Sequence, residues 1–190
     1  MGGAESRDAD ITCWALAARH GDSVARDRFV RATQQDVWRF VAHLVEASAA
    51  DDLTQETYLR ALRALPRFSG QSSARTWLLS IARRVAVDHY RATRTRPRTA
   101  DLDDWQAAAD RTQPLGLPGF DDGVALDDLL ATLIAERRTA FVLTQAMGLT
   151  YEEAAEICRC PVGTIRSRVA RAREHLMALL RDAEDIPGGR

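Results

Sequence analysis

The chain has 190 residues, enough for one or two small domains, and 46% of them are hydrophobic, so each domain can bury a core. Its formal net charge is -1, which argues against a uniformly basic protein that binds nucleic acid over its whole surface. No apolar run approaches the ~20 residues that span a membrane, and the polar, acidic start of the chain carries no secretory signal, so we expect a cytoplasmic protein with no membrane partner.

Residues 10–95 are expected to form a helical N-terminal domain, because they show no strand-like alternation of apolar and polar side chains. One or two amphipathic helices in its first half would place a set of apolar side chains in the core. This set is Phe29, Val30, Val37, Phe40, Val41 and Leu44. We assign no chemistry to them.

An acidic helix is predicted at residues 51–62. Four of its side chains recur at i, i+3, i+4 and i+7 and share one face, namely Asp52, Gln55, Glu56 and Leu59. Three others are expected to enter the core, namely Tyr58, Leu62 and Leu65. An acidic face repels DNA and favours a basic protein surface, although a merely solvated face fits the residues equally well. No histidine accompanies the carboxylates, so no catalytic or metal-binding pair is predicted.

Pro66 ends that helix, and a polar loop over residues 67–73 leads to a basic helix that Ser72 or Ser73 can cap. A stripe of side chains is expected to be buried, namely Leu78, Ile81, Val85 and His89. The opposite side holds Thr76, Ser80, Arg83, Arg84, Val87 and Arg91, with Trp77 and Asp88 at its border. A basic, hydroxyl-rich face beside an aromatic ring is suited to single-stranded or distorted DNA. Packing of Trp77 in the core is an equally good interpretation.

Residues 96–122 are predicted to be a linker, because proline, glycine and aspartate are frequent there. The charge alternates along the chain. Residues 67–96 contain seven arginines and one acidic residue, whereas residues 101–128 contain eight aspartates and one arginine. Basic segments on either side of an acidic one indicate two DNA-contacting units joined by a tether.

The C-terminal unit, residues 123–182, ends in a predicted helix-turn-helix. Thr150 and Glu153 have the spacing of a capping box, which starts a short helix over residues 151–158. Pro161 suits the first position of the next helix. That helix carries an apolar stripe, Ile165, Val169, Ala172 and Leu176. Thr164, Ser167, Arg168 and Arg171 project to another side, and Arg166 and Arg173 flank the stripe. These features together favour a DNA-binding helix over a solvated charged one.

Three cysteines without a secretory signal fit a reducing compartment. Cys158 and Cys160 lie in the turn of the helix-turn-helix, and a zinc site would need two further ligands that His175 alone does not supply. We therefore expect no metal and no cofactor. No cluster of catalytic residues and no phosphate-binding glycine loop is evident, so we expect no enzyme and no small-molecule substrate.

Several segments together resemble a known family. They are DDLTQETYLRA at 51–61, RFS at 67–69, ARTWLLSIARR at 74–84, DHYR at 88–91, GLTYEEAA at 148–155 and CPVGTIRSRVARAR at 160–173. In this order and spacing they resemble the extracytoplasmic-function sigma factors of bacterial RNA polymerase, the smallest type of the sigma-seventy family, and most closely the actinobacterial members. The resemblance implies an all-α fold of two small helical domains joined by a flexible acidic linker.

The resemblance also implies a division of labour. Such a factor binds core RNA polymerase, through its beta-prime and beta subunits, and gives it specificity for promoter DNA. The segment that docks on the beta-prime coiled coil would be Asp51, Asp52, Leu53, Gln55, Glu56 and Leu59. Many members of the family are held inactive by an anti-sigma factor, which adds such a protein as a candidate partner.

The remaining family segments imply two sets of DNA contacts. Recognition and melting of the minus-ten element, with a base flipped into the loop, would use Arg67, Phe68, Ser69, Gln71, Ser72, Arg75, Thr76, Trp77, Ser80, Arg83, Arg84, Asp88 and Arg91. Recognition of the minus-thirty-five element as duplex would use Thr150, Tyr151, Pro161, Val162, Gly163, Thr164, Arg166, Ser167, Arg168 and Arg171.

Two positions depart from the family pattern. Arg159 stands in the turn where the family often has glycine, which costs on the order of 1–2 kcal/mol if the residue must be left-handed. Thr54 stands where many members have an apolar residue. The alternative function is a standalone helix-turn-helix regulator, which would have no use for an acidic docking face beside a basic helix.

Overall fold

The computed structural model describes residues 2–95 and 122–184, so all of the predicted linker except its last residue lies outside the described part. The described residues form helices and turns without a strand, which confirms the all-α prediction. The helices are α1 (Gly2–Ala18), α2 (Ser23–Ala42), α3 (Ala47–Ala64), α4 (Ala74–Thr95), α6 (Asp122–Ala131), α7 (Ala135–Phe141), α8 (Tyr151–Cys158) and α9 (Val162–Glu184). A 3₁₀ turn, η1 (Leu65–Arg67), follows α3, and a π-helical turn, η2 (Val142–Ala146), follows α7.

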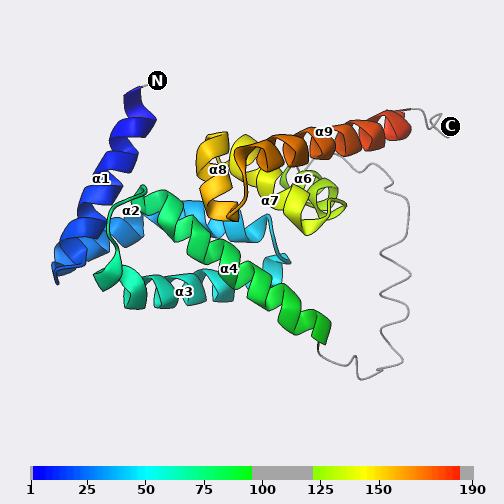
Figure 1. Ribbon diagram of the computed structural model, residues 1–190. Coiled ribbons are helices and arrows are strands. Elements are labelled where there is room, and N and C mark those ends of the chain that lie inside the picture. The colour runs from blue at the N-terminus through cyan, green and yellow to red at the C-terminus, as the bar shows by residue number, and fades with distance from the viewer. Residues whose placement is uncertain (1, 96–121, 185–190) are drawn as a thin grey trace.

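Helices α1 to α4 form the N-terminal bundle, in which α1 packs on α2, α2 on α3, and α4 on the other three (Figure 1). Asp22 starts α2 by accepting a hydrogen bond from the amide of Ala25 at 2.9 Å. Phe29, Phe40 and Leu78 are fully buried in the core of the bundle. Burying each such side chain contributes about 1.5–3 kcal/mol, so packing rather than helix propensity holds these helices in place.

Helices α6 to α9 form the C-terminal unit, and α8, the first helix of its helix-turn-helix, has the predicted bounds. The Thr150 hydroxyl accepts from the amide of Glu153 at 3.1 Å, and the Glu153 carboxylate accepts from the amide of Thr150 at 2.8 Å. This capping box satisfies two donors that would otherwise be unpaired at the start of α8. In α9 the predicted apolar stripe faces the core, with Ile165 and Ala172 fully buried.

The turn between α8 and α9 keeps a left-handed residue although the side chain there is not glycine. Arg159 has φ 53 and ψ 50, and it is the one described non-glycine residue with positive φ. Its amide bonds the carbonyls of Ala155 and Glu156, which ends α8. The turn therefore retains left-handed geometry at a steric cost of about 1–2 kcal/mol. Helix α9 begins at Val162, one residue after the predicted Pro161.

The two described parts of the chain, on either side of the predicted linker, pack together. Helix α8 lies along α4, and buried residues from both halves form one continuous cluster (Figure 1). Polar contacts between described residues also cross the junction. The Arg75 guanidinium donates to the carbonyl of Met147 at 3.1 Å, Arg138 donates to the carbonyl of Leu44 at 3.4 Å, and His43 Nδ1 lies 2.7 Å from Asp127 Oδ1.

Two side chains lie on the opposite side from their predicted one. Leu62 was expected in the core but is 36% exposed, because Ala61 and Leu65 occupy the buried positions at the end of α3. Thr76 was expected on the exposed face of α4 but is buried. Ser73 caps this helix by accepting from the amide of Thr76 at 3.1 Å, which turns the Thr76 side chain inward to bond the Ser73 hydroxyl.

Candidate nucleic-acid and partner-protein interfaces

The acidic face of α3 is exposed and carries apolar surface between its charges. Asp52 and Gln55 are exposed, and the Leu59 side chain, one turn further on, is 52% exposed. Glu56 is half-buried because it accepts a 2.7 Å hydrogen bond from Arg60. An exposed leucine flanked by carboxylates is suited to a protein partner with a basic and partly apolar surface.

Trp38 belongs to the same surface, although sequence reasoning missed it. It lies on α2, is 45% exposed, and donates from its indole nitrogen to the Asp51 carboxylate at 2.8 Å. This bond fixes the orientation of a large aromatic ring beside the predicted docking residues. The available sequence signal was a tryptophan next to, and not on, the helical stripe of Phe29, Val37 and Phe40.

A groove runs between α2 and α3 next to this surface, with Gln34, Gln55 and Tyr58 in its walls. Burial raises the pKa of Tyr58 to about 12, and its hydroxyl shares a 2.7 Å hydrogen bond with that of Thr33. Thr54 lines the groove with 7% of its surface exposed, and its hydroxyl has no hydrogen-bond partner among the described residues. The groove therefore combines polar and apolar walls with a buried hydroxyl that has no partner among the described residues.

The loop between α3 and α4 is built around an aromatic pair. The ring of Phe68 is buried and lies 4.9 Å from that of Trp77, with the two planes tilted by 42°. Ser69 and Gln71 are exposed, and Ser72 is partly exposed. Phe68 and Thr76 are thus placed to support the loop from within, whereas the exposed polar side chains are the ones available to a base. The predicted DNA contacts of all these residues stay predictions.

Only part of the arginine-rich face of α4 is open to solvent. Arg84 and Arg91 are exposed, as is Asp88, which accepts a 2.6 Å hydrogen bond from Arg60. Arg75 is instead held by Asp36, with its Nε 2.8 Å from Oδ2, and the two side chains are 17% and 12% exposed. Arg83 is partly buried beside the Cys158 thiol of α8, whose pKa is raised by burial to about 11.

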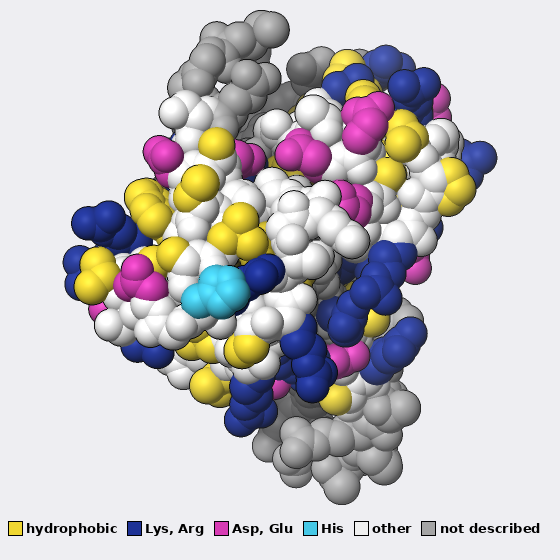
Figure 2. All heavy atoms as spheres, turned by 60° about the vertical axis from the view of Figure 1, so that its left-hand side comes forward, with side chains coloured by type: hydrophobic (Ala, Val, Ile, Leu, Met, Phe, Trp, Pro, Cys, Tyr) yellow, Lys and Arg dark blue, Asp and Glu magenta, His cyan; other side chains and the backbone are white. Residues whose placement is uncertain are grey.

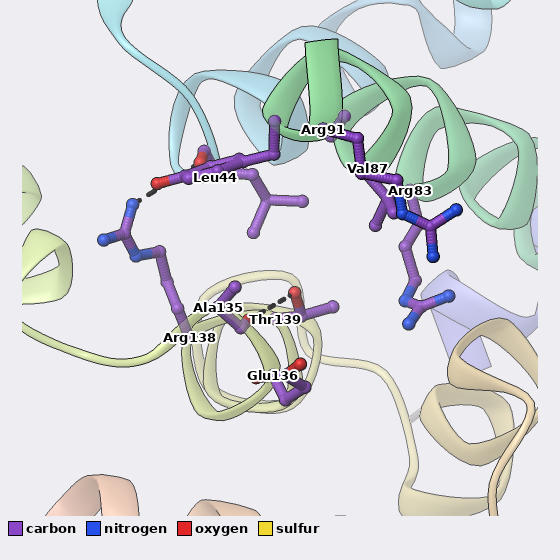
Figure 3. Close-up of a pocket in the computed structure, with 10 residues that line it drawn as sticks. Leu44, Arg83, Val87, Arg91, Ala135, Glu136, Arg138 and Thr139 are labelled. Atoms are coloured by element: carbon purple, nitrogen blue, oxygen red, sulfur yellow. Dashed lines mark hydrogen bonds between the residues drawn. The ribbon is translucent and has the colours of Figure 1, made fainter. Parts of the chain in front are cut away.

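A cavity of about 260 Å³ separates α4 from α7 at the junction of the two halves (Figure 3). Arg83 and Arg91 lie on one side of it, and Arg138 on the other side points away to reach the carbonyl of Leu44 (Figure 3). Two arginines predicted to contact DNA, Arg83 and Arg91, therefore line the junction between the halves in this arrangement.

The start of α9 presents most of the residues predicted to contact duplex DNA. Gly163, Arg166, Ser167 and Arg171 are exposed, and Arg168 is partly buried as it donates to the Cys160 sulfur at 3.7 Å. The Arg166 guanidinium lies 6.0 Å from the ring centre of Tyr151, a cation–π distance. Figure 2 shows arginines on one face of the molecule in a band along its lower part and in a second group at the upper right.

Among the described residues, no group of three or more histidine, cysteine, aspartate or glutamate side chains is arranged to bind a metal ion. In the same part of the chain, no helix is long and apolar enough to cross a membrane.

Two family models match the chain: sigma-70 region 2 over residues 29–96 and sigma-70 region 4 over residues 123–176. The chain is 52% identical over 185 residues to the ECF RNA polymerase sigma factor SigC of Mycobacterium tuberculosis, an alignment that covers 96% of this chain and 97% of that protein. It is 34% identical over 179 residues to the RNA polymerase sigma-H factor of Pseudomonas aeruginosa, with 87% and 93% covered.

Two solved structures are similar to the whole arrangement. CnrH in complex with the cytosolic domain of CnrY superposes with a TM-score of 0.69 at 24% identity and covers 91% of this chain and 98% of that one, a likeness that shows the fold alone. The sigma factor RpoE of Bartonella quintana, in complex with the anti-sigma factor NepR, gives a TM-score of 0.63 at 30% identity, with 82% and 96% covered.

Proposed function

The chain belongs to the extracytoplasmic-function sigma factors of the sigma-70 family, non-catalytic factors that direct promoter-specific transcription with core RNA polymerase, and we propose how its surfaces divide this work. Helix α3 with Trp38 of α2 docks on the polymerase, through the coiled coil of the beta-prime subunit. The loop before α4 and the exposed side of α4 recognise and open the minus-ten element. Helix α9 recognises the minus-thirty-five element as duplex.

The observation that carries the docking assignment is the exposed acidic face of α3 with Leu59 and Trp38 at its edges. Exposed aromatic and aliphatic side chains within a charged rim are the usual anchors of protein interfaces. Carboxylates repel the DNA that the rest of the chain binds, so they also keep this face free for protein.

The two DNA assignments rest on different chemistry. Around the loop, Ser69 and Gln71 offer exposed hydrogen-bonding groups next to the Phe68–Trp77 pair, which suits an unstacked base. On α9, Arg166 and Arg171 project from a rigid helix behind a capped helix-turn-helix, which suits base edges and phosphates of a duplex.

The two halves must separate before both elements can be bound at once. The element names place their centres about 25 base pairs apart, or roughly 85 Å at ~3.4 Å per base pair. Helix α8 lies directly on α4 in the packed arrangement, so the surfaces that would bind the two elements are next to each other. We propose that core polymerase binds the separated form and that the packed form is the free chain.

An anti-sigma factor is a further proposed partner. The Bartonella quintana sigma factor, at 30% identity, is solved with such a protein, NepR. Any anti-sigma factor of this chain could bind the two halves in their packed arrangement, because α4 and α8 are in contact without it. The standalone regulator considered from the sequence is not favoured, because the region 2 match covers most of the N-terminal half.

Reconstituted transcription tests the proposal. Purified chain plus core polymerase is expected to start RNA at promoters that core polymerase alone ignores. Asp52→Arg reverses a charge on the exposed acidic face and should abolish both binding to core polymerase and transcription, whereas Asp10→Arg, an equal change at an exposed site of α1, should not. Equal activity of the two variants would remove the docking assignment. Tight promoter binding without stimulated starts would favour the regulator.

A further inference from the structure

Helix α1 touches the loop between α3 and α4 at three points, although all three contacting residues precede the segment matched by the region 2 model. The loop begins at Phe68 and leads to Ala74, the first residue of α4. Each end of it is hydrogen-bonded to α1 or to the turn that follows α1, and its centre packs against α1. No residue in the first 28 positions was singled out from the sequence for a functional role.

The first contact fixes the start of the loop. Arg19 lies just after α1 and donates from Nη1 to the carbonyl of Phe68 at 2.8 Å. Phe68 is the buried partner of Trp77, so this bond holds the backbone from which the aromatic pair is built. A guanidinium donor makes the bond stronger than one between two neutral groups.

The second contact fixes the end of the loop. The Thr12 hydroxyl accepts from the amide of Ala74 at 3.0 Å and donates to the carbonyl of Asp8 at 2.8 Å, so both of its roles are used. The amide of Ala74 is among the first donors of α4, which the helix itself cannot satisfy. Thr12 thus caps α4 from another helix, two positions before the amide of Thr76, which Ser73 satisfies.

The third contact lies at the centre of the loop. Gly70 has φ +75, and a Cβ added there would lie 3.3 Å from the Leu16 side chain. The loop therefore passes close over α1 in a conformation that other residues rarely adopt. Ile11 and Ala15, on the buried side of α1, are fully enclosed in the core, so α1 is a rigid support.

We propose that α1 positions this loop, and that Arg19 and Thr12 thereby set the base preference at the minus-ten position that the loop captures. This inference rests on the proposed function of the loop. A captured base is recognised only while the loop backbone holds its polar groups at hydrogen-bond distance. A small displacement at Phe68 or Ala74 therefore lowers the preference for the correct base before it lowers general promoter binding.

The test compares Arg19→Ala and Thr12→Val with Arg7→Ala. Arg7 is a matched control. It lies on α1, as Thr12 does, and like Arg19 it donates to a backbone carbonyl, but this is the carbonyl of Ala32 in α2, at 2.9 Å, and not one in the loop. Open-complex formation with reconstituted holoenzyme is measured on promoters carrying each of the four bases at every minus-ten position. The readout is the ratio between the best and the other bases. Thermal unfolding of each variant is measured in parallel.

Arg19→Ala is expected to reduce this ratio about fivefold, as loss of one hydrogen bond worth about 1 kcal/mol predicts. Arg7→Ala should leave the ratio unchanged, and Arg19→Lys, which keeps a donor, should retain most of it. A uniform loss at all four bases in Arg19→Ala would overturn the inference, since a merely structural role predicts that pattern. Thr12→Val supplies the same comparison, at the other end of the loop, if Arg19→Ala does not fold.

The variant Gln71→Ala tests whether the loop captures a base at all, independently of whether α1 positions the loop. If Gln71→Ala changes the base preference while Arg19→Ala and Thr12→Val resemble Arg7→Ala, the loop captures a base and α1 does not position it. If Gln71→Ala and Ser69→Ala both leave the preference unchanged, the capture role of the loop is wrong and the inference falls with it.

Discussion

Replacing Thr54 by valine should stabilise the free chain. The Thr54 side chain lies in the groove between α2 and α3 with 7% of its surface exposed, and its hydroxyl has no partner among the described residues. Valine has nearly the same shape and no polar atom. The substitution therefore removes the desolvation penalty of the hydroxyl without opening a cavity or forcing a neighbour to move.

A buried, unsatisfied polar group costs about 1–3 kcal/mol in proteins. We expect the lower end of this range, about 1 kcal/mol, because Thr54 lines a groove that opens to solvent and does not lie deep in the core. For a chain of this size that gain raises Tm by roughly 2–4 °C. Both residues are β-branched, so their helix propensities differ too little to reverse the sign.

Thr57→Val provides the matched control. Thr57 is on the same helix and fully buried, but its hydroxyl donates to the carbonyl of Leu53 at 2.7 Å. Its replacement loses a hydrogen bond and should be neutral or destabilising by up to about 1 kcal/mol. Urea unfolding measures the free energy of unfolding of both variants, and an unchanged m-value shows that the surface exposed on unfolding is the same. If Thr54→Val destabilises as much as Thr57→Val, the Thr54 hydroxyl is satisfied in solution and the reasoning fails.

Three further predictions concern the junction and the DNA surface. Asp127→Ala removes the exposed contact with His43 between the halves. Such contacts contribute about 0.2–1 kcal/mol to the packed form, so its loss should raise the affinity of the free chain for promoter DNA about 1.4- to 5-fold, as measured by fluorescence anisotropy. No change in affinity would refute a packed free form. Burial raises the pKa of Cys158 to about 11 from 9.0, so at mildly alkaline pH its thiolate fraction is roughly 100-fold below that of an unperturbed thiol and exposed Cys13 should be alkylated first; equal rates would contradict this. Because the folded pKa is raised, the associated stability is full below pH 9 and is lost as pH rises through about 11. Arg171→Ala should weaken binding to the preferred minus-thirty-five sequence by about 1–3 kcal/mol if Arg171 contacts a base, whereas equal weakening on all sequences would make it a phosphate contact.

The helix-turn-helix was predictable in detail because its signals are local. Thr150 and Glu153 each accept a hydrogen bond from the other's backbone amide within one helical turn. The apolar stripe from Ile165 to Ala172 follows helical spacing, so no distant residue is needed to predict either feature. Leu62 was misplaced because helical spacing alone does not say how far the core extends along α3. Trp38 was missed because its role depends on Asp51, which lies on the next helix.

The role of α1 was still harder to predict from the sequence, because it depends on contacts between distant residues. Its contacts with the loop join residues 49 and 62 positions apart in the chain. Nothing in the local sequence around Thr12 or Arg19 distinguishes them from ordinary polar positions on a helix surface. Their importance arises only once α4 is packed on α1, which brings an unsatisfied amide and a loop carbonyl within their reach.

The arginines of α4 explain why the packing of the two halves could not be foreseen. A guanidinium binds a phosphate oxygen, a carboxylate or a backbone carbonyl through the same planar set of donors. Arg75 has the sequence context of a DNA contact, yet it is held by Asp36 and the carbonyl of Met147. The carbonyl of Met147, just before α8, thus occupies a position next to Arg75. A phosphate could take that position only after α8 has moved. Because Nε of Arg75 is bonded to Asp36 and Nη2 to Met147, DNA binding through Nη2 requires that the bond to Met147 break, and contact with DNA then favours the separated halves.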